Sequence, residues 1–323
     1  MPVQALSRLL LVVFTTWCAA VAAQSFPNRP LKILVPAVAG SSPDIRARQI
    51  AAKLSDAFGQ PVIVEARPGA NGLIAAREAV KAPADGHTLL LAIINSAVAD
   101  ALNPDPCCRL GMELLPVSRF SMTPYLILVN ANVPAQSLRE FLDLARAKPE
   151  TVTFASHGPG SLPSLLGQWL KAEWGVPLLE VPYKAVNAEI PDLQSGQVMS
   201  AFIVPQVVLA AMKAGKLRAL AVASRERLSI LPEVPTAAEA GLPGFEAIVW
   251  NGIFVPAGTP PAVIQTLHRE LVRAYNAPEI REQLRAGGSY AAADTPEEFL
   301  AFVRSEVDKW GRLGRAAGIK PAQ

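Results

Sequence analysis

Short apolar segments alternate with amphipathic helical segments along most of this chain, and this order constrains its fold most strongly. The first series predicts strands at 31–35, 61–65 and 88–94, with helices at 44–58 and 72–81 between them. Strand and helix in strict alternation within one sheet imply parallel strands joined by right-handed crossovers. Gly59 is the expected end of the first helix, and Ser42 and Pro43 its expected N-cap and first turn.

A second series of the same kind starts near residue 125. Ser137 and Glu140 form a capping box for its first helix. The further segments predicted are strands at 125–129, 152–155, 178–181, 198–203 and 217–222, helices at 162–174, 187–194 and 206–214, and a return strand at 247–255 followed by helices. This repetition predicts an α/β fold of two lobes around a cleft, each a mostly parallel sheet flanked by helices. The expected lobes are residues 24–124 with 247–323 returning, and residues 125–246.

The first 23 residues have the pattern of a cleaved export signal. Arg8 precedes the apolar stretch 9–14, and the small residues Val21, Ala22 and Ala23 supply a cleavage site. The apolar part is shorter than the roughly 20 residues of a membrane span. We therefore expect export to the periplasm with cleavage near Ala23. The chain has 30 Lys and Arg against 27 Asp and Glu and no basic run, so nucleic acid is not an expected partner.

Two small-residue loops, 36–44 and 156–161, each follow a predicted strand and open a predicted helix. Backbone N–H groups at a helix start bind anions, so the two loops predict two half-sites facing one small anionic ligand. The candidate ligand residues in the loops are Ala37, Ala39, Gly40, Ser41, Asp44, Ser156, His157, Gly160 and Ser161. Asp44 has the alternative role of complementing the helix dipole. By helical direction, Arg46 and Arg48 are expected to point to solvent.

Two further candidates lie beyond these loops, each with a structural alternative. Ser96 follows a predicted strand and either lines the cleft or is an inert loop serine. Tyr183 is either an aromatic lid over the ligand or a core tyrosine. Trp250 is expected to pack where the chain crosses between the lobes.

Only Cys107 and Cys108 remain after removal of the leader, and they are adjacent. The preferred interpretation is two surface-loop cysteines without a role; a strained vicinal disulfide or a redox-sensitive loop stays open. The three histidines show no ligand spacing with each other or with the cysteines, so no metal site is expected.

Several motifs along the mature chain stand in the order of one known family. They are 26–30 (FPNRP), 35–44 (VPAVAGSSPD), 59–65 (GQPVIVE), 67–72 (RPGANG), 85–90 (DGHTLL), 181–184 (VPYK), 214–222 (AGKLRALAV), 231–236 (LPEVPT) and 256–260 (PAGTP). The chain resembles the periplasmic solute-binding proteins of tripartite tricarboxylate transporters, the Bug receptors. The resemblance implies a Venus-flytrap fold, no cofactor and no catalysis. It also implies a small carboxylate ligand, delivered to the membrane components of a transporter or, in some relatives, to a signalling partner. A monomer is expected, because a flytrap must open and close.

The chain departs from the family pattern at several ligand positions. Ala37 replaces an aromatic residue, Ser41 replaces a glycine, and Ser164 stands where a histidine is common. Met199 and Ile203 occupy two positions that are often acidic in the resembling strand, and Ile203 is taken as a ligand-binding position. Because an acid at 203 would pair with an ammonium group, its loss favours a less polar carboxylate over an amino acid.

An exported hydrolase is the competing class, with Ser161 or Ser41 as its nucleophile. Neither serine lies in a Gly-x-Ser-x-Gly elbow. A third interpretation, a purely signalling receptor, differs from a transport receptor only in its partner.

Overall fold

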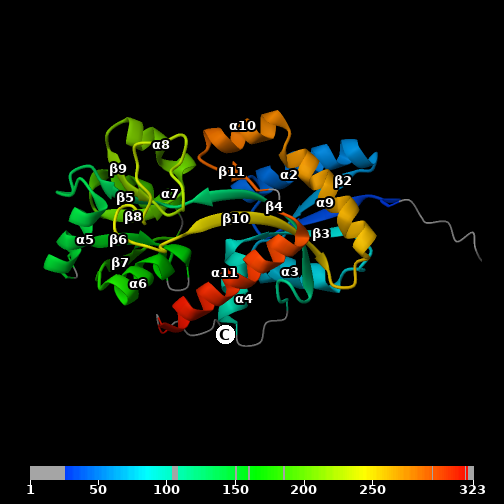
Figure 1. The fold of residues 1–323 in the computed structure, drawn as a ribbon, viewed down its shortest axis with the longest axis horizontal. Helices are drawn as coiled ribbons and strands as arrows, with labels where there is room; N and C mark the ends of the chain where they lie inside the picture. The colour runs from blue at the N-terminus through cyan, green and yellow to red at the C-terminus, as the bar shows by residue number, and fades with distance from the viewer. Residues whose placement is uncertain are drawn as a thin grey trace, which may run out of the picture.

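The computed structural model describes residues 26–103, 108–149, 151–158, 161–184, 186–292, 294–316 and 318. Within these ranges the strands form two sheets that lie side by side along the long axis (Figure 1). The six-stranded sheet has the order β11-β4-β10-β3-β1-β2, and the five-stranded sheet has the order β7-β6-β8-β5-β9. The two-lobed α/β fold is therefore confirmed.

The first sheet consists of β1 (Leu31–Val35), β2 (Val62–Ala66), β3 (Thr88–Ile93), β4 (Leu114–Pro124), β10 (Ile248–Pro256) and β11 (Tyr290–Ala291). The helices with it are α2 (Ser42–Phe58), η1 (Ala70–Gly72), α3 (Leu73–Lys81), α4 (Ile94–Leu102), α9 (Pro261–Tyr275), α10 (Pro278–Ala286) and α11 (Pro296–Ala316). Leu31, Ile33 and Val35 pack against α2 and α9, whereas Leu34 packs on the opposite face with α3, α4 and α11. Successive side chains of a strand point to opposite faces of the sheet, so apolar residues on both sides of β1 pack against helices on both faces of the first sheet.

The second sheet consists of β5 (Leu126–Asn130), β6 (Thr153–Ser156), β7 (Leu179–Pro182), β8 (Ser200–Ile203) and β9 (Leu217–Val222). Its helices are α5 (Leu138–Ala147), α6 (Leu162–Trp174), α7 (Val186–Ser195) and α8 (Pro205–Lys213). Ile127 and Val129 face the core shared with α5 and α6, and Leu126 and Leu128 face α7 and α8.

Both sheets are mixed rather than mostly parallel. The predicted parallel pairing holds for β1 with β2 and β3, and for β6 with β7 and β8. The antiparallel pairs involve β4, β5 and β10, at the places where the chain leaves the first sheet and returns to it. A segment that leaves a lobe and a segment that comes back run in opposite directions, so β4 and β10 pair antiparallel through the middle of the molecule (Figure 1).

The sequence missed α4, β4 and β11. Helix α4 begins directly after β3 without a turn residue, so its apolar start was assigned to the strand. Strand β4 contains Pro116 and Pro124, and proline within an apolar run argues against a central strand. Pro116 pairs with Phe254 of β10, but β11 reaches only Ser121 and Met122, so on its other side Pro116 has no strand partner, as at a sheet edge.

The local end signals were mostly correct. Ser137 caps α5 as predicted by accepting from the Glu140 N–H at 3.3 Å, whereas the Glu140 carboxylate accepts from the Gln136 N–H and not from Ser137 as in a full capping box. Gly59 ends α2 in the left-handed conformation with φ 62°, which glycine adopts without strain. The N-cap of α2 is Ser41, one residue before the predicted Ser42, and its side chain makes no capping hydrogen bond.

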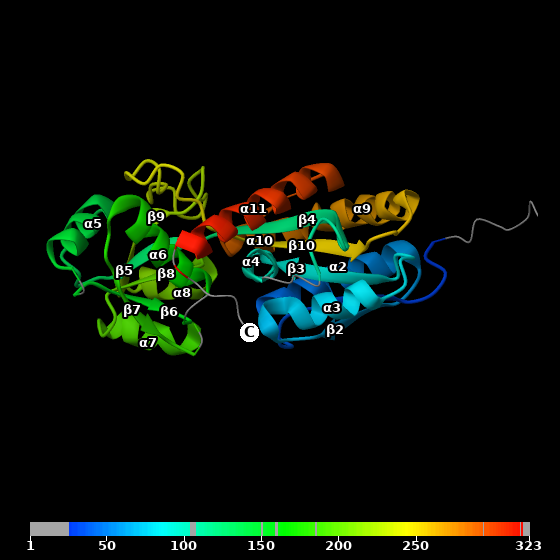
Figure 2. The same ribbon diagram turned by 90° about the horizontal axis from the view of Figure 1, so that it is seen from below.

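The C-terminal helix α11 contacts both lobes. It packs on α4 and β4 and also touches α6 of the second lobe, and its red end reaches that lobe in Figure 2. A Cβ at Gly314 would lie 2.1 Å from Leu102 Cδ2, so a larger residue there would displace the Leu102 side chain from its place between α11 and α4. Trp250 is fully buried on β10, and its indole donates to Glu306 of α11.

Cys108 is buried in the core beside α4, which corrects the expectation of a surface cysteine. Cys107 lies outside the described residues. The segment that follows Cys108 is held by Asp100 of α4, whose carboxylate accepts from the Leu110 N–H at 3.0 Å. Burial raises the pKa of the Asp100 carboxyl to about 6, and the negative charge of Glu113 adds to the increase.

We expect Asp100→Asn to stabilise the protein at pH 7.5 but not at pH 4. A carboxyl whose pKa is raised from 3.8 to about 6 on folding destabilises the folded state increasingly as the pH rises from 4 to 6. The asparagine keeps an oxygen for the Leu110 N–H and carries no charge. The free energy of unfolding from urea titration should rise by about 1–3 kcal/mol at pH 7.5. An equal gain in the free energy of unfolding at both pH values would contradict this account, because it would point to a difference in helix propensity and not to the charge. Asp143→Asn, which changes an exposed carboxyl, is the control.

Candidate ligand site between the two lobes

A cavity of about 230 Å³ lies where the crossing strands meet both lobes. Ser42, Pro43 and Arg46 of α2 line it from the first lobe, and His157, Glu189 and Ile203 line it from the second. Side chains of β4 and β10 complete the wall. The start of a helix from one lobe therefore faces a loop and a helix of the other across a small, partly open space.

The first loop is closed on itself rather than open to the cavity. Asp44 is 2% exposed, and one of its oxygens accepts from the Gly40 N–H at 2.9 Å. Arg48 donates to the same carboxylate at 2.9 Å, and this bond, followed by the Gly40 bond, holds the pKa of Asp44 below its usual value. The Gly40 donor is thus occupied within the loop. Ala37, Ala39, Gly40, Ser41 and Asp44 are not in the cavity wall, although their neighbours Ser42, Pro43 and Arg46 are.

Arg46 lies in the cavity wall and is half-buried, which corrects the expectation that it points to solvent. Burial lowers the pKa of its guanidinium below its usual value. Among the described residues no carboxylate forms an ion pair with it. A partly desolvated cation without a protein partner is the kind of group that binds a carboxylate.

The second loop is ordered by its own serines. Ser156 is fully buried, donates to Glu180 at 2.5 Å and accepts from the Gly158 N–H at 3.0 Å. Ser161 caps α6 and accepts from the N–H groups of Ser164 and His157. Gly160 lies outside the described residues. Of this loop, the cavity wall contains His157.

Glu189 is the acidic residue in the wall, and sequence reasoning missed it. It lies on α7, its side chain is 1% exposed, and its Oε2 is 3.3 Å from His157 Nε2. Ile203, one of the predicted ligand positions, is also in the wall and provides apolar surface. Glu189 of α7 therefore supplies this wall with a carboxylate, whereas β8, which ends at Ile203, supplies none. No pattern in the sequence distinguishes Glu189 from a surface glutamate in the first turn of a helix.

A family model described as tripartite tricarboxylate transporter family receptor matches residues 46–319. The chain belongs to this family. It is 34% identical to protein BugT of Bordetella pertussis over 304 residues, which cover 94% of this chain and 93% of BugT.

Solved structures agree with the assignment. A Rhodopseudomonas palustris protein with adipate has a TM-score of 0.78 and 29% identity, over 92% of this chain and 100% of its own. MatC of the same organism, with bound malate, has a TM-score of 0.75 and 30% identity, over 89% and 99%. The receptor is thus a periplasmic-type solute-binding protein, and not an enzyme.

The remaining predicted residues of the receptor have structural partners. Ser96 lies within α4, 7% exposed, and accepts from the Ile93 N–H at 3.4 Å. Tyr183 donates to Asp192 at 2.9 Å; partial burial, followed by Asp192, raises the pKa of its phenol to about 12. Neither is in the cavity wall. Ser161, the candidate nucleophile of the hydrolase interpretation, has its oxygen occupied by two backbone donors.

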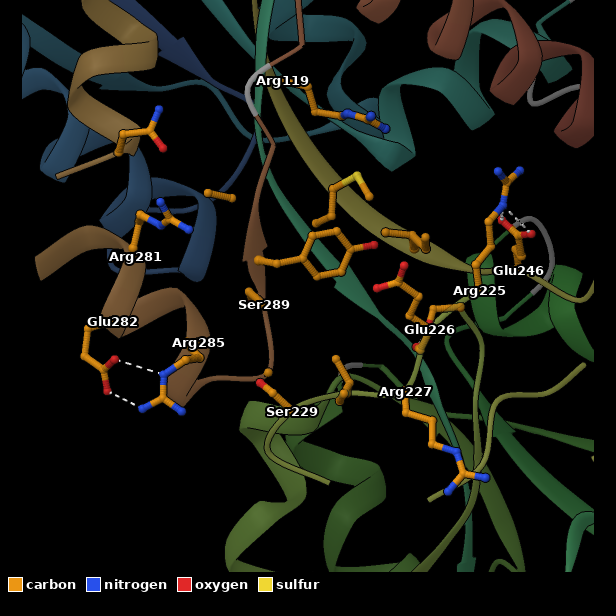
Figure 3. Close-up of a pocket in the computed structure, with 18 of the residues that line it drawn as sticks. Arg119, Arg225, Glu226, Arg227, Ser229, Glu246, Arg281, Glu282, Arg285 and Ser289 are labelled. Carbon is orange, nitrogen blue, oxygen red and sulfur yellow. Dashed lines mark hydrogen bonds and ion pairs between the residues drawn. The ribbon is translucent and has the colours of Figure 1, made fainter. Parts of the chain in front are cut away.

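The receptor has a second, larger hollow of about 990 Å³ between α10, β11 and the segment 224–229 (Figure 3). Several arginines line it, but most of them are matched by acids. Arg225 pairs with Glu246 at 3.0 Å and Arg285 with Glu282 at 2.7 Å, as the dashed lines in Figure 3 show. Arg119 pairs with Asp294 at 2.6 Å. Arg281 of the same wall is exposed, whereas Arg46 is half-buried, so the smaller cavity is the stronger candidate anion site.

Within the described ranges, no three His, Cys, Asp or Glu side chains cluster closely enough to hold a metal ion. No helix there is both long and apolar enough to span a bilayer.

Proposed function

We propose that the receptor captures a small carboxylate in the 230 Å³ cavity and delivers it to the membrane components of a tripartite tricarboxylate transporter. Arg46 carries this proposal, because it is a half-buried cation in the cavity wall with no ion-pair partner among the described residues. The cavity is smaller than the 300 Å³ typical of drug-sized sites, which favours a small organic acid. Adipate and malate in the two related structures belong to the same chemical class.

The energetics are in the correct range for reversible capture. A guanidinium makes up to two charge-assisted hydrogen bonds with one carboxylate, each contributing about 1.5–3 kcal/mol. The start of α2, lined by Ser42 and Pro43, adds a favourable helix dipole of about 0.3–1 kcal/mol. Micromolar affinity requires about 8 kcal/mol, so these terms with the burial of the ligand's carbon skeleton suffice for a transport receptor.

The proposal also covers where the receptor works and which lobes move when it binds its ligand. Cleavage near Ala23 would release the mature chain into the periplasm as a monomer. Residues 24–124 with 247–323, and residues 125–246, would then close on the ligand as two bodies joined through β4 and β10. A signalling partner is the alternative recipient of the loaded receptor.

A thermal-shift screen tests the proposal. Mature protein is unfolded, stripped of ligand and refolded, and then exposed to small carboxylates and to the amide of each. A saturable rise in melting temperature with a carboxylate, and none with its amide, is the expected result. Amides that stabilise as well as their acids, or a panel with no effect at all, would refute carboxylate capture.

A further inference from the structure

Glu189 is a buried acid with one carboxylate oxygen that has no hydrogen-bond partner among the described residues. Its side chain is 1% exposed, and Oε2 makes no hydrogen bond to any described residue. The group faces the cavity from α7. An ionised carboxylate removed from water is destabilised by several kcal/mol unless a cation or donors compensate it.

Among the described residues, the basic group that pairs with Glu189 is His157. Its Nε2 lies 3.3 Å from Glu189 Oε2, and the imidazole is charged only when protonated. No Lys or Arg of the described chain pairs with this carboxylate. Its negative charge also contributes to raising the pKa of Tyr125 in the same wall, although burial of that phenol is the larger cause. The second-lobe side of the cavity is therefore an electronegative site.

The opposite side carries the opposite charge. Arg46 enters the same cavity from α2 of the first lobe and has no ion-pair partner among the described residues. A cation and an anion that face one small cavity from two lobes, each without a full partner, are complementary to a ligand that carries both charges. A dicarboxylate would satisfy Arg46 but would place a second negative charge in the space that Glu189 occupies.

We infer that the ligand is zwitterionic: its carboxylate binds Arg46 and its ammonium group binds Glu189. This rests on the proposed function and reverses the ligand class expected from Ile203. Glu189 then determines specificity, because it attracts an amine and repels a second acid. Closing of the lobes brings both protein charges to one ligand.

Matched pairs of ligands test the inference by calorimetry. Each pair contains an amino acid and the acid that lacks only its amine: alanine and propionate, aspartate and succinate, glutamate and glutarate, phenylalanine and 3-phenylpropionate. In wild-type protein we expect the amino acid to bind at least about tenfold more tightly in one or more pairs. In Glu189→Gln that ratio should fall to near one, through weaker binding of the amino acid and not of its partner. Glu173→Gln, which removes an exposed acid from the same lobe, should keep the wild-type ratio.

The outcomes separate the two proposals. Acids that bind as tightly as their amino counterparts in wild-type protein would overturn the zwitterion inference and leave carboxylate capture intact. The same holds for a Glu189→Gln protein that retains the wild-type ratio. If neither member of any pair binds, carboxylate capture fails, and the inference fails with it. The wild-type ratios decide the question even if the variant does not fold.

Discussion

Arg46→Ala is expected to weaken carboxylate binding by about 100-fold or more, which is the loss of two charge-assisted hydrogen bonds. The same substitution should leave the stability of the ligand-free protein unchanged or slightly higher. The reason is that Arg46 is half-buried and forms no ion pair with the described residues, so its removal breaks none. Calorimetric titration gives the affinity, and thermal unfolding without ligand gives the stability.

Two further variants sharpen this result. Arg46→Lys keeps the charge but not the planar fork, so an intermediate affinity is expected. Lys53→Ala removes a positive charge from the same helix, where it pairs with Glu279, and should not change the affinity. Wild-type affinity in Arg46→Ala would move the binding site away from this cavity.

Glu306→Ala should cause a large loss of stability. Glu306 is 5% exposed, and its Oε2 accepts from the indoles of Trp250 at 3.2 Å and Trp310 at 3.0 Å, while Oε1 pairs with Lys309. Removal of the carboxylate leaves two buried N–H donors without a partner, which is expected to lower the free energy of unfolding by about 2–6 kcal/mol. Guanidinium titration followed by tryptophan fluorescence measures the loss.

A surface control separates this effect from simple charge removal. Glu282→Ala breaks an exposed pair with Arg285 and should change stability by less than about 1 kcal/mol. Glu306→Gln retains an oxygen for the indoles and should lie between the two. A Glu306→Ala protein as stable as Glu282→Ala would show that the indoles find other partners.

The sequence predicted features that depend on neighbouring residues. The Ser137 cap, the stop at Gly59 and the parallel pairing of β1 follow from local propensity and from strand–helix alternation, and the structure confirms them. The sequence predicts a strand where the chain returns to the first lobe, but it does not predict that this strand pairs antiparallel with β4. The pairing depends on which segment leaves the first lobe. That segment is β4, and its two prolines argue against a strand in the sequence.

The candidate site could be predicted only in part. Helical periodicity identifies the face of α2 that packs on its own sheet, through Ala47, Ile50 and Leu54. It gives no sign that a neighbouring face meets a second lobe more than 100 residues further along, so Arg46 was assigned to solvent. Glu189 was missed for the same reason. His157, which follows β6 directly, and Ile203, the last residue of β8, are predicted ligand positions that line the cavity wall.

The order of strands has a consequence for the order in which the two sheets form. All five strands of the second sheet come from residues 126–222, so this sheet can form as soon as that stretch is available. The first sheet has β10 between β3 and β4, a strand that arrives about 150 residues after β3. Contacts of long sequence separation form slowly because their loop-closure entropy is large. The inserted lobe should therefore fold first, and the lobe that begins and ends the chain should be completed last.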